Sequence, residues 1–202
     1  MWKATRITAD AAEKMQINAG LLLNKFDITK PESPAEEDII CDTTGDFGIT
    51  CTPNISDLFE DVNNAPTNTM EGKHITGWNC GLSVTALSVT EETLKLSLGA
   101  CEVGEDGGIH PRSQFKVEDF KSLYWIGDMM EEGKLFCVAM DHTVSTGGLS
   151  YTATNKGKGR LALTLTPHAS LQEQNKVPMA FYILTKMGGE EQLAAPTIEV
   201  EE

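Results

Sequence analysis

One long alternating stretch constrains the fold more than any other feature of the sequence. It runs from Lys73 to Thr90 and reads KHITGWNCGLSVTALSVT. The alternate positions are occupied by His74, Thr76, Trp78, Cys80, Leu82, Val84 and Ala86. This period of two predicts a β-strand with one buried face. After Ala86 the apolar positions shift to Leu87 and Val89. Because a one-residue slip turns every later side chain to the opposite face, the sequence predicts a long strand with a β-bulge or bend near Ala86.

Other segments predict further strands. KSLYWIGD (121–128) and KLFCVAMDH (134–142) flank the turn MMEEG and predict an antiparallel hairpin. Segments 149–154 and 160–166 flank the turn NKGKG in the same way. Single strands are expected at 16–23, 45–52 and 177–184, and one helical turn is expected within 55–62.

One helix is predicted at 91–98. Thr90 is placed to cap its N-terminus, Leu94 and Leu98 fall on one face, and Gly99 is placed to end it. Strands at regular spacing with a single helix predict a mainly β fold, a β-sandwich or partly closed barrel with one flanking α-helix. We expect one domain over 1–187, with a long acidic loop at about 27–46, and an acidic C-terminal tail over 188–202.

The charge balance argues against nucleic-acid binding. Sixteen basic and thirty acidic side chains give a net charge of −14, which opposes a surface that holds phosphates. No run of about 18 apolar residues is present for a membrane span. Asp10 and Glu13 stand where a secretory signal needs an apolar core, so we expect a soluble protein used without export.

Residue patterns that carry chemistry are missing from the sequence. The five cysteines are odd in number and form no CxxC pair, which favours reduced thiols over a disulfide framework or a zinc site. The four histidines are scattered, no GxSxG elbow occurs, and the segment KGKGR lacks the frame of a phosphate loop. We therefore expect no catalytic residue, no metal and no cofactor, and a protein that is not an enzyme.

Several segments carry a resemblance to a known family. The stretches INAGLLLNKFD, GWNCGLSVTALSVTEETLKLSLGA, STGGLSYTATNKGKGRLALTLTPHASL and KVPMAFYI occur in this order and span most of residues 16–184. Together they resemble the major tail protein of long-tailed, siphovirus-like phages and prophages, which is the tail-tube subunit. The resemblance is carried by the order of these segments and by their coverage of the chain.

The resemblance implies a structural role. Hexameric rings of such subunits stack into a hollow tube, with a continuous β-barrel as its inner wall, through which DNA passes from capsid to host. The type VI secretion tube protein is similar in fold. The implied partners are further copies of the chain and other tail proteins (tape measure, tail terminator and distal tail), without a membrane. The implied location is the virion, after assembly in the host cytoplasm. An acidic wall would repel DNA and let it slide.

Charged loops are the assembly candidates. We expect the excursions at 27–46 and 55–72 to reach neighbouring subunits, and the basic hairpin tip to meet an acidic partner. The candidate interface residues are Asp42, Asp46, Asp57, Glu60, Asp61, Lys156, Lys158 and Arg160. A carbohydrate- or receptor-binding β-sandwich is the main alternative, although three Trp and three Tyr offer few aromatic platforms. A decoration or head–tail joining protein is the alternative within the structural class.

Overall fold

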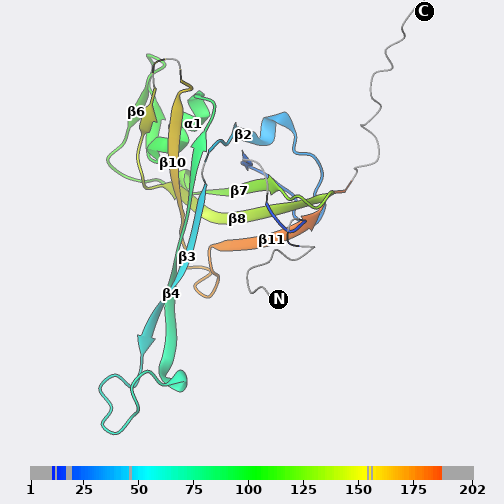
Figure 1. Ribbon diagram of the computed structural model, residues 1–202. Helices are drawn as coiled ribbons and strands as arrows, with labels where there is room; N and C mark the ends of the chain where they lie inside the picture. The colour runs from blue at the N-terminus through cyan, green and yellow to red at the C-terminus, as the bar shows by residue number, and fades with distance from the viewer. Residues whose placement is uncertain are drawn as a thin grey trace, which may run out of the picture.

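A computed structural model describes residues 11, 13–16, 20–45, 47–153, 155 and 157–187 (Figure 1). The described chain is mainly β with one α-helix, as predicted. Its elements are β1 (Leu21–Leu23), β2 (Ile39–Asp42), β3 (Gly48–Asp57), β4 (Lys73–Ala86), α1 (Glu91–Leu98), β5 (Cys101–Val103), β6 (Ile109–Pro111), β7 (Lys121–Asp128), β8 (Lys134–Ser145), β9 (Ser150–Thr152), β10 (Arg160–Pro167) and β11 (Met179–Thr185). Short 3₁₀ turns precede β2, β4 and β7, at Glu36–Asp38, Met70–Gly72 and Val117–Asp119.

Nine strands form one antiparallel sheet that is not closed into a barrel. The strand order is β2-β1-β7-β8-β10-β4-β3, with β11 paired to β8 and β9 paired to β10, while β5 and β6 form a separate small sheet. The predicted mainly β class with one flanking helix is confirmed, and the nine strands form one open sheet.

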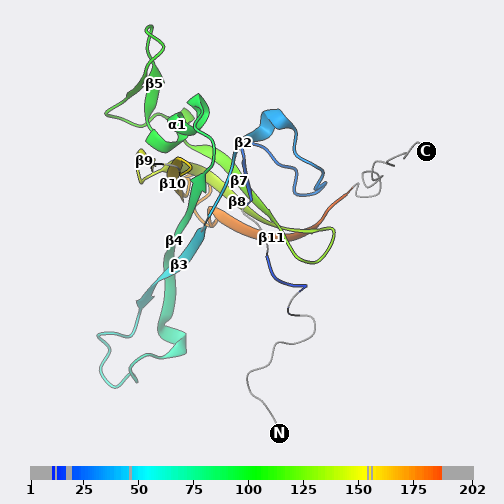
Figure 2. The same cartoon turned by 45° about the horizontal axis from the view of Figure 1, so that its top comes forward.

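β8 joins the two halves of this sheet. Its residues 134–140 lie between β7 and β11, whereas its residues 143–145 pair with β10. His142 lies between the two parts with φ of 48°, outside the extended region, and the register of β8 with β7 shifts here. Both views show β7, β8 and β11 running across β3, β4 and β10 (Figures 1 and 2). The sheet is thus folded over on itself.

The main core lies between the two halves. Leu82 of β4, Leu163 of β10 and Trp125 of β7 are all fully buried and belong to one cluster. Phe47 stacks on Trp125 with ring centroids 4.2 Å apart, and the Trp125 indole Nε1 donates a hydrogen bond to Thr43 Oγ1 at 3.3 Å. Each fully buried Leu contributes about 2 kcal/mol relative to an exposed one. The fold is therefore anchored where β4, β7 and β10 face one another.

Most of the predicted strands are confirmed. The β7–β8 hairpin, β9, β10 and β11 all fall within the predicted segments or within a few residues of them. The strand predicted at 16–23 is represented by β1 and by an isolated bridge from Gln16 to Met129. The acidic loop at 27–46 contains β2, which was not predicted and which pairs with β1. The predicted tail, residues 188–202, lies outside the described residues.

The predicted helical turn within 55–62 is wrong. β3 was expected to end at residue 52, but it continues to Asp57, and residues 58–61 form turns instead of a helix. The physical reason is that β4 pairs with β3 along this whole length, apart from one register shift after Asn54. Pairing with a neighbouring strand overrides a weak local helix preference.

The helix is confirmed with both of its predicted ends. The Thr90 side chain accepts a hydrogen bond from the backbone N–H of Thr93, and Gly99 ends the helix with φ of 73°. The fully buried helix residues are Thr93 and Ser97, whereas Leu94 and Leu98 are only partly buried. Small side chains on this face let the helix lie close to its neighbours.

Candidate assembly interface

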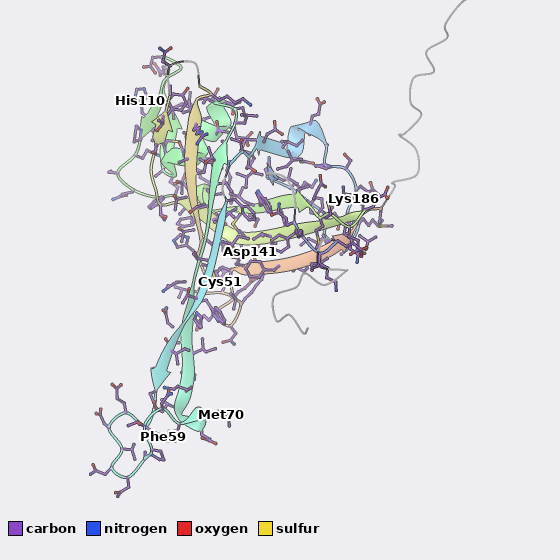
Figure 3. All side chains as sticks on the ribbon, viewed as in Figure 1. Cys51, Phe59, Met70, His110, Asp141 and Lys186 are labelled. Carbon is purple, nitrogen blue, oxygen red and sulfur yellow. The ribbon has the colours of Figure 1, made fainter. Side chains whose placement is uncertain are left out.

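The β3–β4 hairpin projects from the body as a two-stranded ribbon (Figures 1 and 3). All ten residues of β3 pair with β4, from Gly48 opposite Ser83 to Asp57 opposite Lys73. β4 pairs with β10 only over residues 82–86, so in the described chain β3 is its sole strand partner over residues 73–81. Residues 52–79 are called the arm below.

The alternating stretch that predicted β4 is buried only in its second half. Cys80, Leu82, Val84 and Ala86 are buried as predicted. His74, Thr76 and Trp78 continue the same alternation along the chain but are exposed. The reason is geometric: pairing with β10 ends at Leu82 and the core cluster ends at Cys80, so the outer half of β4 extends beyond both.

The predicted bulge lies in the arm and not near Ala86. Asn54 pairs with Gly77 and Ile55 pairs with Ile75, which leaves Thr76 as the extra residue. The shift of apolar positions after Ala86 has another cause, because β4 ends there and the following residues lead into α1.

The bulge places four apolar side chains on one face of the arm. Pro53 pairs with Trp78, and Ile55, two residues further along β3, pairs with Ile75. Because directly opposed residues and residues two apart share a face, Pro53, Ile55, Ile75 and Trp78 form one stripe, called the arm stripe below. Without the extra Thr76, Ile75 would point to the other face.

The arm stripe continues the core-facing side of the sheet. Moving toward the body, the next cross-strand pairs on this face are Cys51 with Cys80 and Ile49 with Leu82, and Leu82 is fully buried. Within the stripe, by contrast, Ile55 is 58% exposed, Ile75 49% and Trp78 38%. An apolar face that extends from the core into solvent is typical of a surface that another molecule covers.

The opposite face of the arm is polar and holds the two strands together. The side-chain amides of Asn54 and Asn79 exchange hydrogen bonds of 2.9 and 3.4 Å across the strands, and Thr76 Oγ1 donates to the Asn54 carbonyl at 3.1 Å. The arm is therefore amphipathic, with one apolar face and one face that forms hydrogen bonds between the strands.

The far end of the arm is acidic and also carries exposed apolar side chains. Asp57 forms an ion pair with Lys73 at 3.0 Å and accepts a hydrogen bond from the Phe59 backbone N–H, and these contacts hold the pKa of its carboxyl below the ordinary value. Glu60 and Asp61 follow in the exposed loop. Figure 3 shows Phe59 and Met70 at this end. The exposed large apolar residues beyond the stripe are Leu58, Phe59, Val62 and Met70.

The structure separates the predicted interface residues into two groups. Asp57, Glu60 and Asp61 come together at the end of the arm. Asp42, at the end of β2, is exposed on the body, as are Lys158 and Arg160 before and at the start of β10. Asp46 and Lys156 lie outside the described residues.

A second uncovered feature is the free edge of β11. Among the described strands β11 pairs only with β8, and its outward residues Phe181 and Ile183 are 45% and 67% exposed. An unpaired strand edge is a template for another strand.

Other kinds of site are not found in the described residues. They hold no cluster of three or more potential metal ligands. None of the helices they form is long and apolar enough to span a membrane.

The sequence interpretation missed the arm stripe. It selected charged residues as candidates and took the alternation around Trp78 as evidence of burial. The available signal was the presence of the apolar residues Ile55, Ile75 and Trp78 in this region. That they share one face can be deduced only when the register of β3 with β4 and the position of the bulge are known.

The fold and the arm together define the class: a mainly β protein with an open, folded-over sheet and an apolar ribbon left uncovered. No protein-family model matches the chain, and no curated protein matches it. Two solved structures give distant matches over most of the chain. One is a chain of the virion of a native gene transfer agent particle, with a TM-score of 0.39, 10% identity, and coverage of 81% of this chain and 95% of that chain. The other is a chain of the tail of an empty gene transfer agent particle with C6 symmetry, with a TM-score of 0.38, 10% identity and the same 81% and 95% coverage. Because both TM-scores are low, this likeness decides nothing about what the chain does.

Proposed function

We propose that this chain is a structural subunit of a phage tail, and specifically the tail-tube subunit, assembled into hexameric rings that stack around a channel for DNA. The observation that carries this proposal is the arm stripe, an apolar extension of the core-facing side that no part of the described chain covers. The kind of assembly is inferred from the resemblance to major tail proteins, which spans most of residues 16–184.

The arm is suited to docking on a neighbouring subunit. An isolated two-stranded hairpin is only marginally stable in water, so a projecting ribbon gains stability when a partner covers it. Covering the exposed parts of Ile55, Ile75 and Trp78 would contribute roughly 1 kcal/mol each. In a ring or stack, every subunit both offers an arm and receives one, so the small gain per arm repeats at every contact.

Charge favours a second copy of the chain as the receiver. The end of the arm carries Glu60 and Asp61, whereas the body presents Lys158 and Arg160 at the β9–β10 hairpin. An acidic arm end on one copy and a basic hairpin tip on another are complementary, and such pairs steer association and fix its register more than they add affinity.

The channel role fits the net charge. With a charge of −14 the chain has little capacity to hold phosphates, which suits a conduit through which DNA slides. In this proposal the chain performs no catalysis, its partners are further copies and other tail proteins, and its place is the virion after assembly in the host cytoplasm.

Electron microscopy of the purified chain over a concentration series tests the proposal. We expect hollow tubes or six-fold rings with an axial channel wide enough for a duplex. The double variant Ile55→Ser, Ile75→Ser should remain folded by circular dichroism and fail to form them. Leu171→Ser is the matched control, because Leu171 is 88% exposed but lies outside the arm.

Three results would contradict this proposal in whole or in part. Normal tubes from the double variant would show that assembly does not depend on the arm stripe. A closed dimer or trimer without a channel would favour the receptor-binding alternative instead. Rings that form but never stack would point to a decoration or head–tail joining protein.

A further inference from the structure

Two cysteines face each other at the base of the arm. Cys51 of β3 and Cys80 of β4 are directly opposite in register, and their Sγ atoms are 3.0 Å apart. Both thiols are free. Directly opposed residues in an antiparallel pair have Cα atoms about 4.5 or 5.5 Å apart, and both spacings fall in the range that a disulfide spans. The backbone is therefore already placed for a bond between them.

The pair stands at the boundary between the body and the arm. Cys80 is the last buried residue on the core-facing side before Trp78 opens the arm stripe, and Leu82 is where pairing with β10 begins. Figure 3 places Cys51 where β3 leaves the body. A bond here would tie the two strands together at the point where they lose their support.

The other three cysteines are differently placed. Cys41 and Cys137 are buried in two separate apolar clusters. Cys101 Sγ donates a hydrogen bond to the Lys95 carbonyl at 3.6 Å.

We propose that Cys51 and Cys80 form a site of oxidative modification, at which exchange with a small-molecule disulfide such as oxidised glutathione produces a cross-strand disulfide. This inference does not depend on the proposed function. It concerns the unassembled chain, in which the base of the arm is open to small molecules.

Exposure sets the order of the two exchange steps. Cys51 is partly exposed, whereas Cys80 is 7% exposed, so the oxidant meets Cys51 first. The Cys51 thiolate attacks one sulfur of the oxidant, forms a mixed disulfide and releases one glutathione thiolate. Cys80 Sγ then attacks the Cys51 sulfur, releases the second glutathione and loses its own proton to that leaving group. Two cysteine thiols are oxidised, and one oxidised glutathione is reduced to two thiols.

Burial shapes the second step. It is the main reason why the pKa of the Cys80 thiol is raised to about 12, with the contact to Cys51 adding to it. Cys80 is therefore mostly protonated at neutral pH. Because only its small thiolate fraction attacks, the second step needs a sulfur held beside it, which the mixed disulfide on Cys51 provides.

Peptide mapping of the full chain tests the site. The folded protein is incubated with oxidised glutathione, the remaining thiols are blocked by alkylation, and the chain is cut with trypsin and with a protease that cleaves after acidic residues. The second cut at Asp42 separates Cys41 from Cys51, which share a tryptic peptide. We expect one dominant product, a peptide pair linked through Cys51 and Cys80.

Single variants establish the order of the steps. Cys80→Ser should trap a glutathione adduct on Cys51, whereas Cys51→Ser should leave Cys80 as a free thiol. Cys101→Ser is the control and should form the linked peptides as the unchanged chain does. In the oxidised chain, amide hydrogen exchange across residues 52–79 should slow by roughly tenfold or more, because the bond restricts opening of the ribbon.

Three results would overturn the inference. One is a mixed disulfide on Cys51 of the unchanged chain that never resolves onto Cys80. Another is that both thiols stay unmodified at every oxidant concentration. The third is a linked product that joins any other pair of cysteines.

Discussion

β4 crosses from the core into solvent, and truncating one aliphatic side chain on each side of the crossing should give very different losses of stability. Leu82 is fully buried, so Leu82→Ala should cost about 2–5 kcal/mol. Ile75, on the same face of the same strand, is 49% exposed, so Ile75→Ala should cost only about 1 kcal/mol. For a chain of this size each kcal/mol lowers the melting temperature by about 2–4 °C.

Thermal unfolding followed by circular dichroism measures both losses. The melting temperature should fall by roughly 5–20 °C for Leu82→Ala and by only a few °C for Ile75→Ala. The comparison is made at a concentration where both variants are monomers, because assembly would stabilise the arm. Equal losses for the two variants would refute the reasoning, since they would mean that Ile75 is covered as Leu82 is.

Three other predictions concern the ends of the helix and the end of the arm. Thr90→Ala removes the N-cap hydrogen bond of α1 and should lower the free energy of unfolding by about 1 kcal/mol in urea titrations. Gly99→Ala should lower the free energy of unfolding by more than about 1 kcal/mol, because φ is 73° and the added Cβ would lie 2.8 Å from a β8 carbonyl oxygen. The control Gly48→Ala, where nothing lies within 4 Å of the added Cβ, should leave the stability nearly unchanged. Similar losses of stability in the two variants would contradict this prediction. The pKa of Asp57, measured by NMR, should lie below its ordinary value of 3.8 and should rise in Lys73→Met. Since this pKa is lowered by folding, the stabilisation from the pair is present above pH 3.8 and is lost as the pH falls through the folded pKa; an unchanged pKa in the variant would exclude the pairing.

The local elements were largely predictable because each has a short-range cause. The capping of α1 depends on Thr90 and Gly99, which stand next to the helix in the sequence. The β7–β8 hairpin depends on two apolar segments separated by one turn. In both cases the interacting residues are neighbours along the chain, so their spacing carries the information.

The strand β2 and the outer half of β3 were not predictable in the same way. Each is held as a strand by a partner that comes from a different part of the chain, β1 for β2 and β4 for β3. The outer half of β3, with Pro53 and several polar side chains, has a weak local preference, and β2 is only four residues long, too short for an alternating pattern to define it. Hydrogen bonding to the partner strand decides their conformation.

The sequence by itself determined that this chain is mainly β, that one capped helix follows its longest strand, and that its net charge is −14. Only the tertiary structure decided which half of that strand is buried. Alternation reports that a strand has two unlike faces, but it does not report how far the partner layer extends. In this protein the layer ends near Leu82, and the extra residue Thr76 then keeps the apolar side chains of the arm on one face. Burial depends on what lies opposite, and that is a property of the folded chain and not of the strand's own residues.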